Sequence, residues 1–246
     1  MEKLYIVIPA YNEQDTIKNV IDDWYPIVEK IGGESKLVVI NDGSKDRTAE
    51  ILDQYSESHE RLIGLTKENG GHGAAILYGY QYALDAGAEY IFQTDSDGQT
   101  VSAEFWDFWK QRRAYDMVIG HRTKRKDGFS RILVTKVLKL VLLLLFHVNV
   151  PDANTPFRLM KAGTLAQYLP LIPPGYNLSN VIISVIYKKK KLAVKYIPIT
   201  FRPRQGGVNS INMKKIIGIG RQAWKDFRTI NKVIAGSTEE KNGYTG

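Results

Sequence analysis

The amino-acid sequence predicts an α/β protein with a mainly parallel sheet that helices cover on both faces. Two observations carry this prediction. Through residues 1–120, short apolar runs alternate with longer segments in which apolar residues recur at helical spacing, and this alternation is typical of parallel sheets. Polar, acidic or glycine-rich residues follow the apolar runs. A parallel sheet gathers such residues at one edge, beyond the carboxyl ends of its strands, where ligands bind.

The first half of the chain alternates strands and helices. Predicted strands lie at residues 4–8, 36–41, 62–66, 90–94 and 117–120, and predicted helices at about 13–31, 48–56, 73–85 and 105–112. The second strand is continuously apolar from Leu37 to Ile40, as expected for a strand buried on both faces. Helix 13–31 has its apolar residues on one face, at 17, 20, 21, 24, 28 and 31. Gly32 and Gly33 end it.

The second half is less regular. We expect helices at residues 130–146, 177–187 and 213–233, β structure at 192–201 and a polar loop at 151–158. Residues 236–246 are rich in Gly, Ser, Thr and Glu, a composition that predicts a disordered tail. The whole chain therefore reads as one domain followed by a short tail.

Composition excludes several classes of protein. Of the 246 residues, 43% are hydrophobic and 24% charged, which is ordinary for a globular domain and excludes a disordered chain, a collagen-like repeat and a polytopic membrane protein. The chain has no cysteine, so disulfides, zinc fingers, iron–sulfur clusters and thiol nucleophiles are excluded as well. A cytoplasmic setting is compatible with this composition.

The charge divides into two regions. Residues 1–120 carry 11 Lys and Arg against 21 Asp and Glu, a net of −10, whereas residues 121–236 carry 22 against 3, a net of +19. A region this basic indicates an anionic partner, such as nucleic acid, an acidic membrane surface or a phosphorylated ligand. Because no nucleic-acid recognition motif is present and the acidic region repels a phosphate backbone, we expect no nucleic-acid partner.

The N-terminus leads directly into a predicted strand and shows no signal peptide. The most apolar segment, residues 140–150, includes His147 and Asn149 and falls short of the about 20 apolar residues that a spanning helix needs. It is either an interfacial helix, with Lys136 and Lys139 at the lipid headgroups, or a buried core helix.

A candidate metal site follows the predicted strand 90–94. Asp95 and Asp97 stand two residues apart, a spacing that presents carboxylate oxygens to one hard cation. Mg²⁺ or Mn²⁺ bound in this way takes its other ligands from water and substrate phosphates. A solvated turn is the alternative for an isolated pair of aspartates. The position at a strand end, beside other polar loops, favours the metal site.

Three more loops at this edge carry candidate residues. Asp42 ends strand 36–41, where a carboxylate accepts hydrogen bonds from a base or ribose, while residues 44–48 suit a turn and helix cap. Glu13 is either a first-turn helix acid or a nucleoside contact. Residues 70–73 form either a flexible glycine-rich loop or a helix N-terminus that meets a phosphate.

In their order along the chain, these motifs resemble glycosyltransferase family 2: Pro9-Ala10-Tyr11-Asn12-Glu13, Asn41-Asp42-Gly43-Ser44, Asn69-Gly70-Gly71-His72-Gly73 and Asp95-Ser96-Asp97. Further along, the chain is similar to the subgroup of dolichyl-phosphate mannose synthases and bacterial polyprenyl-phosphate glycosyltransferases, at Gly120-His121-Arg122, Asp152 with Phe157-Arg158, and Arg202 with Gly206. The resemblance implies a GT-A fold, which is a Rossmann-like mixed sheet in a single domain. It also implies a nucleotide-sugar donor and a divalent metal, Mg²⁺ or Mn²⁺.

The resemblance also implies roles by position. The metal is held by Asp95 and Asp97, approached by Gln99. The nucleotide sugar is bound by Pro9, Ala10, Tyr11, Glu13, Asp42, Gly70, Gly73, Asp95 and Ser96. Phosphates of donor or acceptor are met by Arg122, Arg131 and Arg202. The residues implied to be catalytic are Asp97, Arg122 and Asp152. Asp152 stands at the position where inverting relatives have a general base.

Some residues depart from the subgroup's pattern. His121 replaces a small residue, Pro156 replaces a glycine and stiffens its loop, and the hydrophobic C-terminal helices common among relatives do not follow. These departures bear on the acceptor more than on the donor.

The expected function is therefore an inverting, metal-dependent glycosyltransferase that uses a UDP- or GDP-sugar. Residues 1–120 bind the donor and residues 121–235 bind the acceptor, most simply a polyprenyl phosphate. We expect the protein in the cytoplasm, peripheral at the inner face of the cell membrane, with an acidic lipid surface or a membrane protein as partner. The alternatives are transfer to a sugar hydroxyl in polysaccharide or glycolipid synthesis and a non-catalytic nucleotide-sugar-binding scaffold.

Overall fold

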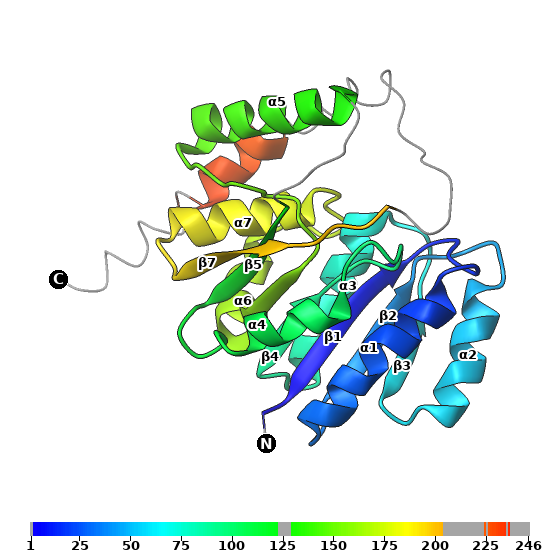
Figure 1. The fold of residues 1–246 in the computed structure, drawn as a ribbon. Coiled ribbons are helices and arrows are strands. Elements are labelled where there is room, and N and C mark those ends of the chain that lie inside the picture. Colours follow the sequence, from blue (N-terminus) through cyan, green and yellow to red (C-terminus); the bar gives the residue numbers. More distant parts are fainter. Residues whose placement is uncertain (1, 123–128, 204–223, 225, 235, 237–246) are drawn as a thin grey trace.

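The structure is a computed structural model that describes residues 2–122, 129–203, 224, 226–234 and 236, without the side chains of 129–136. In this part of the chain, seven strands form one sheet in the order β3-β2-β1-β4-β6-β5-β7 (Figure 1). Their bounds are β1 Leu4–Ala10, β2 Lys36–Asn41, β3 Leu62–Thr66, β4 Tyr90–Gln93, β5 Met117–Arg122, β6 Arg158–Lys161 and β7 Val194–Ile199. Strand β6 is antiparallel to β4 and β5, and the other pairs are parallel. The predicted α/β class with a mainly parallel sheet is confirmed.

Helices cover both faces of this sheet. One face carries α1 (Ile17–Ile31), α2 (Thr48–Ser58) and α4 (Phe105–Trp109), preceded by the short 3₁₀ helix Ser102–Glu104. The other carries α3 (His72–Asp85), α6 (Ala162–Tyr168) with the 3₁₀ turn Leu169–Leu171, and α7 (Ser179–Lys189). Helix α5 (Phe129–Phe146) lies outside α7 as a further layer (Figure 1).

Strand β1 is apolar throughout because both of its faces are buried. In β1, Tyr5 and Val7 pack into the core beneath α3 and α7, whereas Leu4, Ile6 and Ile8 pack into the core beneath α1 and α4. The side chains of a strand alternate between its two faces. A strand between two helical layers therefore needs apolar residues at every position.

Residues 226–234 are helical, as expected within the predicted helix 213–233, of which 213–223 and 225 lie outside the described residues. This helix packs on α5 through Phe227 and Phe146, whose ring centroids are 5.5 Å apart. Lys190 Nζ at the end of α7 donates to the carbonyl of Ile234 at 3.2 Å. The predicted tail lies outside the described residues from 237 onward. Within the described part, none of the helices combines the length and apolar character needed to cross a bilayer.

The prediction of a polar loop at 151–158 was wrong at its end. Arg158 begins strand β6, and helix α6 follows directly. A strand of four residues that carries Arg158 and Lys161 is too short and too polar to show a period. Its direction matters, because Gln93 at the end of β4 pairs with Arg158 at the start of β6. The loop before β6 therefore reaches the same edge of the sheet as the loops after the parallel strands.

Candidate active site

A cavity of about 400 Å³ opens at the carboxyl edge of β1, β2 and β4. Its lining includes these residues predicted for the donor and metal: Pro9, Ala10, Tyr11, Glu13, Asp42, Asp95, Ser96 and Asp97. Asn69, Gly71, His72 and Ala75 complete it. The structure thus brings together the four loops that the sequence places at strand ends, including the one after β3 that leads into the N-terminus of α3.

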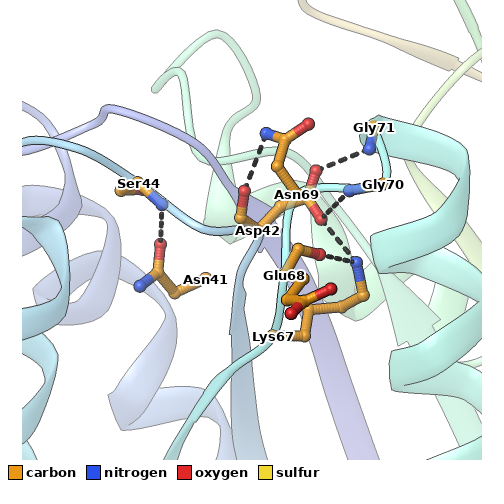
Figure 2. A network of polar contacts seen from close by, with 8 residues as sticks. All are labelled: Asn41, Asp42, Ser44, Lys67, Glu68, Asn69, Gly70 and Gly71. Carbon is orange, nitrogen blue, oxygen red and sulfur yellow. Dashed lines mark hydrogen bonds and ion pairs between the residues drawn. The ribbon is translucent and has the colours of Figure 1, made fainter.

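Asp42 organises the loop between β3 and α3 (Figure 2). Its side chain is almost fully buried. Oδ1 accepts hydrogen bonds from Lys67 Nζ at 2.7 Å and from the Gly70 amide at 3.0 Å, and Oδ2 accepts one from the Gly71 amide at 2.8 Å. Asn69 Nδ2 donates to the Asp42 carbonyl at 2.8 Å. The carboxylate predicted to meet a nucleoside therefore also determines the shape of the glycine-rich loop.

Two glycines in this loop are required by close packing. Gly71 has a φ of +90°, and a Cβ there would lie 2.7 Å from Asn177 Oδ1. A Cβ on Gly73 would lie 2.2 Å from the Tyr176 carbonyl oxygen. Gly73, predicted to contact the donor, thus lies in the first turn of α3 against the segment that precedes α7, and it does not line the cavity. Gly70 reaches the site through its bond to Asp42.

The loops that follow β1 and β2 are joined by reciprocal hydrogen bonds. The amide of Asn12 donates to Ser44 Oγ at 2.9 Å, and the amide of Lys45 donates to Asn12 Oδ1 at 2.8 Å. Asp46 accepts from the amide of Gln14 at 3.1 Å and from Thr48 Oγ1 at 2.6 Å. Burial raises the pKa of Asp46, but these hydrogen bonds outweigh it and hold the pKa below its ordinary value.

Glu13 is buried and turned toward the start of α1. Its Oε2 accepts a hydrogen bond from Thr16 Oγ1 at 2.7 Å, and Thr16 Oγ1 also lies 3.0 Å from the carbonyl oxygen of Ser96. The two interpretations of Glu13 are compatible, because it both interacts at the start of the helix and lines the cavity. Thr16, which sequence reasoning missed, links this acid to the Asp95–Asp97 loop.

Asp95 and Asp97 both face the cavity. Nε2 of His72 lies 3.0 Å from Asp95 Oδ1, and the amide of Gln99 donates to Asp97 Oδ1 at 3.1 Å. Burial lowers the pKa of His72, but the carboxylates of Asp95, Asp97 and Asp42 outweigh it, so the pKa lies above its usual value. The site is therefore rich in negative charge, as a cation site requires.

The oxygen donors present fit a hard divalent cation. Within the described ranges, no three His, Cys, Asp or Glu side chains gather closely enough to hold a metal by themselves. A pair of carboxylates at an open cavity instead suits Mg²⁺ or Mn²⁺, which keep water and take phosphate oxygens as further ligands. Gln99 Nε2 donates to the Arg202 carbonyl at 2.8 Å, which leaves Oε1 as the side-chain atom that a metal would take.

Gln99 and Arg202 form a link between distant parts of the chain. The amide of Arg202 donates to the Gln99 carbonyl at 2.8 Å, in return for the bond from the Gln99 side chain. Two residues earlier, the amide of Thr200 donates to both oxygens of Glu104, each at 3.0 Å. The segment after β7 is thus fastened to the loop that carries Asp97. The Arg202 side chain itself is exposed.

Arg122, the last residue of β5, forms an ion pair with Asp152 at the same edge of the sheet as the cavity. Arg122 Nε donates to Asp152 Oδ2 at 2.7 Å, and Nη2 donates to Oδ1 at 2.8 Å. Only 13% of the Arg122 side chain and 6% of the Asp152 side chain are exposed. The Arg122 guanidinium also lies 5.0 Å from the centre of the Phe201 ring. The two residues predicted as phosphate ligand and general base are thus each other's partners. Arg131 lies in α5, where its side chain is outside the described part.

The chain is similar to known glycosyltransferases. The family model described as glycosyl transferase family 2 matches residues 5–168. An undecaprenyl-phosphate 4-deoxy-4-formamido-L-arabinose transferase of Pectobacterium atrosepticum is 23% identical over 203 residues, which cover 78% of this chain and 61% of that protein. A dolichyl-phosphate beta-glucosyltransferase of Dictyostelium discoideum is 28% identical over 244 residues, 87% of this chain and 72% of that protein. The chain thus spans about three fifths of the first relative's length.

The fold is also that of a solved structure. Glucosyl-3-phosphoglycerate synthase from Mycobacterium tuberculosis, crystallised with Mn²⁺, uridine diphosphate and phosphoglyceric acid, superposes with a TM-score of 0.67 at 19% identity. The match covers 94% of this chain and 78% of that one. The expected single-domain GT-A fold is confirmed. With the matched residues 5–168 spanning β1 to α6 and every loop of the cavity, the chain belongs to glycosyl transferase family 2.

Proposed function

We propose that this chain transfers a sugar from a nucleotide sugar to a polyprenyl phosphate. The observation that carries the proposal is the arrangement of two neighbouring sites at one edge of the sheet. One is an acidic cavity that suits a nucleotide and a divalent ion. The other is a mostly buried arginine side chain, Arg122, paired with Asp152. Relatives named for undecaprenyl phosphate and dolichyl phosphate support the acceptor class.

The donor would lie in the cavity. Tyr11, 44% exposed at the rim, offers a flat face to a base, and the ribose would meet Glu13 and Asp42. Asp95 and Asp97 would hold Mg²⁺ or Mn²⁺, assisted by Oε1 of Gln99. A divalent ion at this position stabilises the charge that develops on a diphosphate leaving group. The sequence and site leave UDP- and GDP-sugars as the donor classes to compare.

The hydrogen bonds of Asp152 support a phosphate as the acceptor. A hydroxyl acceptor requires a general base with a free oxygen toward it, whereas both oxygens of Asp152 accept from Arg122. A phosphate acceptor is already an anion and needs no deprotonation. Arg122, whose fork suits phosphate oxygens, would then bind the acceptor with Arg131 and Arg202, and Asp152 would orient it. Inversion at the sugar follows from a direct attack of this kind.

A membrane surface is the proposed location. Helix α5 exposes Val137, Leu140, Leu143 and Leu144 by half or more, with Lys139 also exposed. Apolar side chains beside a lysine suit the boundary of an acidic lipid leaflet. Peripheral contact with the inner face of the cell membrane would bring the site to a lipid acceptor. A membrane protein as an additional anchor stays a prediction.

Calorimetric titration tests the donor half of the proposal. The chain is titrated with UDP, GDP and dTDP, each with Mn²⁺ and with EDTA. We expect one nucleotide to bind only with metal, and the matching nucleotide sugar then to transfer its sugar to farnesyl phosphate. Binding without transfer to any lipid phosphate contradicts the acceptor assignment. Absence of nucleotide binding contradicts the enzyme proposal and favours a scaffold.

A further inference from the structure

Arg158 is a fully buried cation for which the proposed reaction has no direct use. Its exposure is 0%, and it is the largest side chain of the fully buried set. In the part of the chain that the structure describes, no carboxylate lies within hydrogen-bond distance of its guanidinium. A buried charge without an ionic partner is costly unless every donor is satisfied. Arg158 therefore has a role that requires its particular geometry.

Every partner of this guanidinium is a carbonyl or a hydroxyl. Nε donates to the Thr155 carbonyl at 3.1 Å, and Nη2 donates to the carbonyls of Thr155 at 2.6 Å and Ala153 at 3.2 Å. Nη1 donates to the Asn180 carbonyl at 3.0 Å and lies 3.4 Å from Ser184 Oγ. A guanidinium has five N–H groups in a planar fork, and these five contacts match them. A lysine ammonium, with three donors at one point, cannot reproduce the set.

The contacts connect two pieces of backbone. Ala153 and Thr155 belong to the loop between α5 and β6, directly after Asp152, whereas Asn180 and Ser184 lie in α7. Ser184 Oγ strengthens the connection, since it also lies 3.1 Å from the Ala153 carbonyl oxygen. Arg158 therefore fastens the carbonyls of Ala153 and Thr155, which lie one and three residues after Asp152, to a rigid helix. The loop has little freedom to move Asp152.

Asp152 in turn determines where Arg122 points. The ion pair between them is bidentate, so a displacement of the Asp152 carboxylate displaces the guanidinium with it. A contiguous series of bonds thus runs from Ser184 and Arg158 through the loop to Asp152 and Arg122. The positive charge of Arg158 also interacts favourably with Asp152.

We propose that Arg158 is a positioning residue for acceptor binding: it holds the loop 151–157 so that Asp152 presents Arg122 to the acceptor phosphate. The effect on phosphate binding rests on the proposed function, whereas the effect on the loop does not. The cavity proposed for the nucleotide is lined by other loops, so the proposal predicts different effects on the binding of the two substrates. Loss of Arg158 weakens acceptor binding and leaves nucleotide binding in place.

The test uses Arg158→Lys and the milder Ser184→Ala in the full chain. Leu165→Ala serves as control, because it removes buried apolar contacts in α6 without a hydrogen bond to the loop. Dissociation constants are measured for farnesyl phosphate and for UDP or GDP with Mn²⁺, together with amide hydrogen exchange of the 151–157 and 67–76 peptides. We expect Arg158→Lys to weaken farnesyl phosphate by about tenfold or more, as for a lost charge-assisted hydrogen bond. The nucleotide constant stays within about twofold, and exchange accelerates in 151–157 alone.

Ser184→Ala should show the same pattern with a smaller effect, and it decides the matter if Arg158→Lys does not fold. Leu165→Ala should lower the melting temperature without this selective pattern. Unchanged exchange in 151–157 overturns the proposal, as does parallel weakening of both ligands, which marks a purely structural role. If the wild-type chain binds no farnesyl phosphate, the proposed acceptor fails, and loop exchange alone then decides whether Arg158 positions Asp152.

Discussion

Asp152 and Arg122 lie 30 residues apart in the chain and meet through two hydrogen bonds of 2.7 and 2.8 Å. The ion pair changes the chemical properties of both side chains. A carboxylate whose two oxygens accept from a guanidinium is a poor proton acceptor, and a guanidinium held on one side presents its remaining donors in a defined direction. The two side chains are therefore held as one geometric unit, which we propose recognises the acceptor phosphate.

Breaking this pair distinguishes the acceptor classes. With a phosphate acceptor, Asp152→Asn should reduce transfer by about ten- to a hundredfold, because Arg122 loses its orientation. With a hydroxyl acceptor, loss of the base should cost about 10²–10⁴ in rate. Steady-state kinetics with each acceptor, at saturating donor, measure the difference.

The same substitution should also lower stability. Asp152→Asn leaves a mostly buried Arg122 without its ionic partner, and we expect a loss of about 3 kcal/mol in the free energy of unfolding. The control is Arg113→Met. The Arg113 side chain is 76% exposed and pairs with Glu2. That surface pair should contribute less than about 1 kcal/mol. Urea unfolding of both variants measures the values, and equal losses would contradict the burial argument.

Asp97→Asn should abolish metal-dependent nucleotide binding while the fold is retained. Removing one of two carboxylates from a site for a hard cation takes away a charged ligand that an amide replaces poorly. Asp107→Asn is the matched control, since Asp107 is 65% exposed in α4 and pairs with Lys110, three residues further along the chain. Calorimetry with nucleotide and Mn²⁺ reads out both. Unchanged Mn²⁺ dependence in Asp97→Asn would disprove the metal role.

Gly73→Ala should destabilise the protein by several kcal/mol, because its Cβ would overlap the carbonyl oxygens of Tyr176 at 2.2 Å and Asn177 at 2.5 Å, neither of which can move without the backbone. Gly163→Ala, in α6, is the control, since a Cβ there meets nothing within 4 Å. It should be neutral or stabilising by about 0.5–1 kcal/mol. Thermal melts of the two variants compare the positions directly.

Asp46 should contribute acid-sensitive stability. Hydrogen bonds from Gln14 and Thr48 outweigh burial and hold the pKa of Asp46 below its ordinary value. The contribution is therefore complete above the unfolded pKa of about 3.9 and is lost as the pH falls through the lower folded pKa. Asp46→Asn should cost about 1 kcal/mol at pH 7, because the amide loses the negative charge that strengthens these hydrogen bonds and its NH₂ group cannot accept them. The difference from wild type should shrink below about pH 4, and a difference that stays constant to pH 2 would contradict this origin.

Much of the fold follows from local pattern. The apolar run of β2 can be stable only between two covered faces, and the helical spacing of α1 predicts its buried side, on which Val20 and Trp24 lie. The position of the candidate site was also predictable, since parallel strands bring their carboxyl ends, and the polar residues that follow them, to one edge of the sheet. Tyr11, Asp42 and Asp97 line one cavity, and their shared role in donor binding stays a prediction.

Long-range partners were not predictable in this way. Nothing in the spacing of Asp152 and Arg122 indicates that they pair, and nothing local indicates that Gln99 exchanges hydrogen bonds with Arg202. Both relationships depend on β6, whose four residues run antiparallel between β4 and β5. The sequence therefore determined the mainly parallel α/β architecture and the gathering of acidic residues at one edge of the sheet, because these depend on periodicity and strand direction. Only the tertiary structure decided the partners of the charged side chains, because hydrogen bonds between distant segments depend on distances that no local pattern contains.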